Sequence, residues 1–148
     1  MGVELQKIKL FQNICIFFFS LISCSVSYAD TWLKYWENSE VIAYYEPFSI
    51  LYSNREVEIQ LLNDYKKIQY TENGERYSST TVIKRINCET EKYTSVYLMV
   101  WLLPKAEGKA IYINHKEFGK NSSINENSNM ASVFEIACNK PLEKIERK

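Results

Sequence analysis

The cysteines constrain the fold of this chain more than any other feature of its sequence. Of the four cysteines in 148 residues, Cys15 and Cys24 lie in an N-terminal segment with the pattern of an export signal. Removal of that segment leaves Cys88 and Cys138, and a small exported protein is expected to close such a single pair as a disulfide. Two free thiols or a metal-binding pair are the alternatives. Metal is disfavoured because the chain has no CxxC motif and no histidine close in sequence to either cysteine.

The first 29 residues resemble a cleaved signal peptide. Two lysines precede the apolar run ICIFFFSLI at residues 14–22. This run is too short to supply the ~20 residues that a membrane-spanning helix needs. Ser27 and Ala29 are small residues at the third and last positions before a cut, so we predict cleavage after Ala29 and a mature chain that begins at Asp30.

A second processing signal overlaps the first. Residues 21–24, Leu-Ile-Ser-Cys, resemble a bacterial lipobox, in which Cys24 would become a lipidated N-terminus that anchors the protein to the outer membrane. Cleavage after Ala29 would instead discard Cys24. The spacing of the cleavage site from the apolar run favours simple cleavage, and lipidation of Cys24 remains the alternative.

The charge of the chain is balanced, with 18 lysines and arginines against 18 aspartates and glutamates. From Asp30 onward the formal net charge is −1, because residues 1–29 hold two lysines and one glutamate. A nucleic-acid partner is therefore not expected. Eleven tyrosines and only four glycines are typical of strands with aromatic faces and not of disorder.

Alternating polar and apolar residues predict an antiparallel sheet. The clearest run is REVEIQL at 55–61, in which the three apolar residues face a core and the residues between them face water. The run at 93–103 is apolar on both faces, which is typical of a central, covered strand. Lys84 breaks the alternation of its run, which indicates either a β-bulge or a sheet edge. The predicted strands are 32–36, 41–45, 55–61, 77–88, 93–103 and 109–115.

One helix is predicted at 129–138, after a polar loop at 119–128. Ser128 is its expected N-cap, and four apolar residues share one of its faces: Met130, Val133, Phe134 and Ala137. Strands followed by a single helix predict an α+β fold, in which an antiparallel sheet of five to six strands is covered on one face by the C-terminal helix. We expect one domain at 30–140 and a polar tail at 141–148.

The pair Cys88 and Cys138 would tie that helix to the sheet, since one cysteine ends a predicted strand and the other ends the helix. No catalytic or metal constellation accompanies the pair. His115, the only histidine, lies at the end of a predicted strand, and the sequence has no serine or cysteine motif whose nucleophile it could activate. It is therefore either a surface residue or a ligand contact, for example to a porphyrin. Trp32 and Trp36, at the start of the domain, would mark a partner surface if they are exposed.

Four segments of the mature chain carry a resemblance to a known family. They are YYEPFSI at 44–50, VEIQLLNDYK at 57–66, the strand that ends Ile-Asn-Cys at 86–88, and the Ser-led helix that ends Ala-Cys at 137–138. In this order they resemble the surface-adhesin protein E-like family of bacterial envelope proteins. The resemblance covers nearly all of residues 32–138.

The resemblance implies a sheet-plus-helix domain with a helix-to-sheet disulfide, located in the bacterial periplasm, on the outer-membrane surface or outside the cell. It also implies non-enzymatic binding, in some members adhesion to host proteins or cells. We therefore expect an exported binding protein without a cofactor. The alternative is a periplasmic protein or lipoprotein that binds a small ligand, such as a porphyrin or a lipid.

Overall fold

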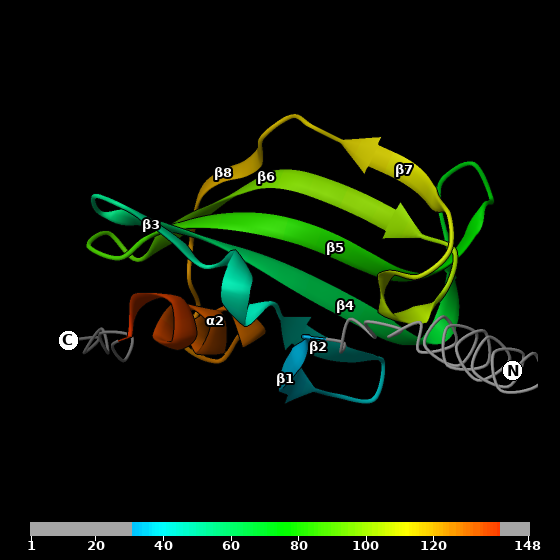
Figure 1. Cartoon of the computed structure of the whole chain (residues 1–148), viewed down its shortest axis with the longest axis horizontal. Coiled ribbons are helices and arrows are strands. Elements are labelled where there is room, and N and C mark those ends of the chain that lie inside the picture. Colours follow the sequence, from blue (N-terminus) through cyan, green and yellow to red (C-terminus); the bar gives the residue numbers. More distant parts are fainter. Residues whose placement is uncertain (1–30, 140–148) are drawn as a thin grey trace, which may run out of the picture. The chain divides into compact units, whose positions relative to one another are not determined.

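The structure is a computed structural model, and it describes residues 31–139. Figure 1 shows a curved sheet with one α-helix beside it. The predicted signal peptide, the lipobox with Cys24, and the tail at 141–148 lie outside the described residues. The elements, in chain order, are β1 (Leu33–Glu37), β2 (Val41–Tyr45), the 3-10 helix η1 (Pro47–Ser49), β3 (Leu51–Ser53), β4 (Glu56–Tyr70), β5 (Arg76–Asn87), β6 (Lys92–Trp101), the 3-10 helix η2 (Pro104–Ala106), β7 (Ala110–Asn114), β8 (Phe118–Ser123) and α2 (Asn129–Cys138).

The predicted architecture is confirmed: all strand pairs are antiparallel, and the one α-helix of the described residues follows the sheet. The strand order is β1-β2-β4-β5-β6-β7, with β3 paired to β4 and β8 paired to β6. The sheet has eight strands where five to six were predicted. The additional strands are β3 and β8, and β8 lies in the polar stretch predicted as a loop. Neither has an alternating pattern, so only their hydrogen bonds to β4 and β6 define them as strands.

Strand β4 is the longest strand of the sheet. The predicted strand at 55–61 continues to Tyr70, through residues whose polarity predicts a loop. Pairing on both edges explains the extension, since β2 pairs with residues 61–65 and β5 pairs along most of its length. Strand β6 is internal as predicted, with β5 on one edge and β7 and β8 on the other. Most of its residues are only half-buried, so the prediction of a strand covered on both faces is wrong.

The hydrophobic core lies between α2 and the sheet. Phe134 and Ile59 are fully buried at its centre. The register places Val57 opposite Ile86 and Leu61 opposite Val82, so these side chains share the face that α2 covers. The four apolar residues predicted on one face of the helix all belong to this cluster. Amphipathic periodicity therefore located the helix surface correctly.

The helix ends are set by local geometry. Ser128 occupies the N-cap position, but its side chain makes no capping bond. Its Oγ donates instead to the carbonyl oxygen of Asn125, at 2.6 Å. Asn139 ends α2 in the left-handed conformation, with φ of 50°, which asparagine tolerates better than most residues. No helix within residues 31–139 is both long enough and apolar enough to cross a membrane.

Candidate functional site

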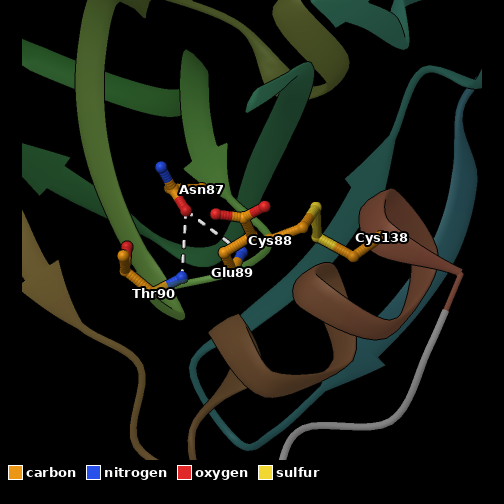
Figure 2. The surroundings of a disulfide bond; sticks show 5 residues. All are labelled: Asn87, Cys88, Glu89, Thr90 and Cys138. Carbon is orange, nitrogen blue, oxygen red and sulfur yellow. Dashed lines mark hydrogen bonds between the residues drawn. A yellow bond between two sulfur atoms is a disulfide. The ribbon is translucent and has the colours of Figure 1, made fainter. Parts of the chain in front are cut away.

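The disulfide pins α2 to the sheet at one end of the domain. Cys88 directly follows β5 and Cys138 is the last residue of α2, with their Cα atoms 5.7 Å apart. Figure 2 shows that Cys88 begins a tight turn, in which the Oδ1 of Asn87 accepts hydrogen bonds from the backbone N–H groups of Glu89 and Thr90, at 3.0 and 2.9 Å. The predicted helix-to-sheet bond is confirmed. The two cysteines also line a hollow beside Tyr52, next to the surface described below.

An exposed apolar segment lies at this end of the sheet. Phe48 in η1 is 85% exposed, and Leu51 and Tyr52 in β3 are 62% and 70% exposed. These residues, the β3 patch, are three of the four most exposed large apolar side chains of the described chain. The sequence prediction missed this surface. The available signal was an apolar run, FSILY, that is too short for a helix and lacks strand alternation.

The β3–β4 hairpin presents this patch. Asn54 and Arg55 form its two-residue turn, and Asn54 has a positive φ of 53°, which asparagine tolerates well. Leu51 pairs with Glu58 and Tyr52 with Val57. Because alternate residues of a strand point to opposite faces, Tyr52 lies on the face that α2 covers and Leu51 on the other.

Two hollows flank the hairpin. One, of about 280 Å³, lies beside the disulfide and is lined in part by Tyr52, Val57, Cys88 and Cys138. The other is polar and is lined by Ser53, Asn54, Arg55, Glu56 and Asn87. The β3 patch is therefore bordered by hollows that have room for side chains of a partner.

The surroundings of the patch are acidic. Three glutamates lie in or beside the hairpin, namely Glu56, Glu58 and Glu89, and a fourth, Glu46, caps η1. Two arginines partly offset them. Arg55 pairs with Glu89 at 3.1 Å and Arg85 pairs with Glu58 at 2.9 Å. The formal balance of these six side chains is −2.

The residues predicted as partner contacts lie elsewhere. Trp36 pairs with Ala43 in the edge strand β1, and Trp32 precedes that strand; both are half-buried. His115 follows β7 at the opposite end of the strand order and is exposed, with its ring centroid 5.0 Å from that of Tyr97. The structure does not bring the tryptophans and the histidine together, and their roles in binding stay predictions.

Lys84 is an unusual residue of the interior. Its strand β5 has partners on both edges, so the sheet-edge alternative is wrong. The register with β6 shifts between Ile83 and Lys84, but the residue left without a partner is Val96 of β6. Lys84 keeps the phase of Val82 and Ile86 against β4, so the predicted bulge does not turn its side chain away from the core face. The Nζ of Lys84 lies 4.7 Å from the ring centroid of Tyr93 and donates to the Oγ of Ser95. Burial lowers the pKa of Lys84 from 10.5 to about 8.

A third hollow lies far from the hairpin. It has a volume of about 300 Å³ and is lined by three residues of the β4–β5 turn and four of the sheet: Tyr77, Leu98, Val100 and Tyr112. This volume is at the lower limit for a small-molecule site. Residues 31–139 contain no group of three or more His, Cys, Asp or Glu side chains that could hold a metal ion.

Comparison with known families identifies the kind of domain. Residues 32–139 match the family model of the surface-adhesin protein E. The chain belongs to the surface-adhesin protein E family. This confirms the resemblance found in the sequence, and membership indicates an adhesin-like surface or exported protein. No curated protein matches the sequence significantly.

Two solved structures of protein E from Haemophilus influenzae share the protein E fold with this chain. The first is 17% identical, with a TM-score of 0.59, and the match covers 74% of this chain and 84% of the other. The second, in crystal form II, is 16% identical with a TM-score of 0.61, and the match covers 74% and 87%. Identities this low show a common fold.

Proposed function

We propose that this protein is an exported, non-enzymatic surface protein that binds a host or envelope macromolecule through the β3 patch. Family membership supports the adhesin-like class. The observation that carries the choice of surface is the exposure of Phe48, Leu51 and Tyr52, three large apolar side chains within five consecutive residues. A local concentration of exposed apolar side chains marks an interaction site. A neighbouring hollow, lined in part by Tyr52 and the disulfide, offers space for side chains of a partner.

His115 is an exposed residue with one described ring contact. It contacts the ring of Tyr97, and no described carboxylate, serine or cysteine hydrogen-bonds to it. General acid–base chemistry needs a positioned partner for the imidazole. Binding also agrees with the placement of the exposed apolar residues at the end of the sheet, away from the core.

Export is proposed from the signal-peptide pattern at 1–29, with Cys24 as the site of lipidation if the lipobox is used in place of the cleavage after Ala29. Metabolic labelling with palmitate and N-terminal sequencing of the mature protein distinguish the two routes. A mature chain that starts at Asp30 and carries no label excludes the lipid anchor. A protein retained with its first 29 residues in the cytoplasm would contradict export altogether.

The binding proposal is tested with purified protein on immobilised matrix proteins, on cell surfaces and on envelope fractions. The test variant combines Phe48→Ser, Leu51→Ser and Tyr52→Ser. The control variant, Ile68→Ser with Tyr70→Ser, removes two exposed apolar side chains at the other end of β4. We expect the test variant to lose binding and the control to keep it. Binding no stronger than that of the reduced, unfolded protein, or equal binding by both variants, would refute the proposal.

The third hollow favours a second candidate function, the binding of a small apolar ligand. Tyr77, Leu98, Val100 and Tyr112 supply an aromatic and aliphatic lining. A visible-absorbance titration with hemin and a fluorescence titration with a fatty acid test the porphyrin and lipid versions. Substitution of Val100 by Trp should abolish either signal, and flat titrations of the wild-type protein would remove this candidate.

A further inference from the structure

We propose that β3 accepts an extended, positively charged segment of a partner protein as an added strand. This inference depends on the proposed function, since it uses the β3 patch, and it names the kind of partner. Three features of the hairpin carry it: the backbone edge of β3, the charge around it and the hollow beside it.

Among residues 31–139, none pairs with the outer side of the β3 backbone. In the hairpin, Ser53 pairs with Glu56 and Leu51 pairs with Glu58, and a two-residue turn makes the closing pair a hydrogen-bonded one. The N–H and C=O groups of Tyr52 therefore point away from β4. Neither is bonded to another described residue. Such an unpaired edge is the template for strand addition.

The space next to this edge is uncovered within the described chain. Strands β2 and β3 pair one after the other with the same edge of β4, at residues 61–65 and 56–58. Strand β1 covers only β2, and its first residue, Leu33, pairs with Tyr45. An added strand would therefore lie in line with β1 and beside β3. Because β3 has three residues, the complementary segment is short.

The charge around the hairpin selects a cationic segment. The four glutamates exceed the two arginines by two charges, and each arginine is already engaged with a glutamate. The C-terminal end of α2, at Cys138, borders the same hollow and has no basic residue in its last turn. A helix C-terminus carries a partial negative charge. Lysine or arginine in the partner would be attracted both by the glutamates and by the C-terminal end of α2. This attraction favours association and fixes the alignment of the added strand.

Side chains of the added strand would alternate between two environments. Those on the side of Tyr52 meet the hollow of about 280 Å³, whose apolar lining includes Val57 and the disulfide. Apolar residues suit this side. Those on the side of Leu51 lie near Glu58 and suit a basic residue. The partner segment is therefore expected to alternate basic and apolar residues.

The probe is a fluorescent nine-residue peptide of alternating lysine and valine, measured by anisotropy with the full chain. The control peptide replaces each lysine by glutamate, and we expect it to bind at least tenfold more weakly. Two protein variants form a matched pair: Tyr52→Ala and Tyr52→Pro both lack the aromatic ring, but only the proline variant lacks the outward N–H. We expect the proline variant to bind about fivefold more weakly than the alanine variant, the worth of one hydrogen bond.

A second measurement covers the case in which Tyr52→Pro does not fold. In the wild-type protein, the lysine–valine peptide should slow hydrogen exchange of the Tyr52 amide and leave that of the exposed Tyr70 unchanged. Equal binding of the two peptides, or unchanged exchange at Tyr52, would overturn strand addition.

The chain supplies one competing occupant, its own C-terminal sequence 140–148, which is also basic and follows closely after Cys138 in the sequence. The peptide should bind the full chain and a variant that ends at Asn139 equally well. Binding only after removal of residues 140–148 would assign the edge to the tail and overturn the proposal. If the triple serine variant loses its macromolecular partner while the peptide fails to bind the wild-type protein, the proposed function stands and strand addition alone is refuted.

Discussion

The Nζ of Lys84 lies 2.6 Å from the Oγ of Ser95, on the face of the sheet that α2 covers. Lys84 sits directly opposite Ile59, which is fully buried in the core. The amine has a hydroxyl and two aromatic rings as neighbours but no carboxylate in the contacts described for it. Its charge is therefore poorly compensated, which is why burial lowers the pKa of Lys84 to about 8.

This lowered pKa makes the stability of the protein rise with pH in a defined window. Between pH 8 and 10.5 the folded protein releases the Lys84 proton while the unfolded chain keeps it, so the unfolded state binds more protons and the free energy of unfolding increases. Burial raises the pKa of Tyr35, which has the opposite effect above pH 10. The informative range is therefore pH 7.5 to 9.5.

We expect the advantage of a Lys84→Met variant over the wild type to fall by about 2 kcal/mol across this range, as measured by urea unfolding at each pH. Lys92→Met, at an exposed lysine of β6, is the control and should follow the wild type. Parallel curves for Lys84→Met and the wild type would show that Lys84 titrates normally.

Loss of the disulfide should strongly lower the stability of the protein. The bond closes a loop with a sequence separation of 50 residues, for which chain entropy predicts about 4 kcal/mol. The double variant Cys88→Ala with Cys138→Ala should lose this amount in denaturant unfolding. Dithiothreitol should lower the melting temperature of the wild type and leave that of the double variant unchanged. An equal response of both proteins to reductant would contradict the assignment.

Two phenylalanines should separate stability from binding. Phe134 is fully buried between α2 and the sheet, so Phe134→Ala should cost about 3–5 kcal/mol of unfolding free energy. Phe48 is exposed, so Phe48→Ala should change stability by less than about 0.5 kcal/mol and should weaken binding to a partner. Thermal melts and the surface-binding assay measure both effects. A strongly destabilised Phe48→Ala variant would mean that this side chain is structural.

The turn residue Asn54 should be intolerant of β-branched side chains. Its φ of 53° is accessible to asparagine and glycine but strained for valine. We expect Asn54→Val to cost about 1–2 kcal/mol and Asn54→Gly to be close to neutral. Chemical denaturation compares the two. Equal stability of the two variants would indicate that the turn adopts another conformation.

The sequence predicted well wherever a pattern repeats along the chain. The alternation in 55–61 located a strand of the core, and the spacing of Met130, Val133, Phe134 and Ala137 located the buried face of α2. Patterns of this kind are local, since they follow from the periodicities of strand and helix. The polar strand β8 and the polar second half of β4 have no such pattern. Their conformation comes from hydrogen bonds to the neighbouring strands of the sheet.

The candidate site was beyond sequence prediction for a related reason. The type of an apolar residue does not tell whether its side chain is buried or exposed. Phe48, Leu51 and Tyr52 could have belonged to the core or to the surface. Tryptophan is common at binding surfaces, so Trp32 and Trp36 were predicted as partner contacts. Both are half-buried, and the residues of the β3 patch are more exposed. Exposure depends on which other segments pack nearby.

The cysteine pair, the order of strands before helix and the apolar faces that join them could be predicted from the sequence, because each depends on residue type and spacing. Three features required the packed chain: Lys84 lies on the core face of the sheet, the outer edge of β3 has no partner strand within residues 31–139, and the end of α2, the disulfide and several glutamates lie near that edge. These features arise where segments separated by tens of residues meet. Their energies depend on burial and distance, which a linear pattern does not contain.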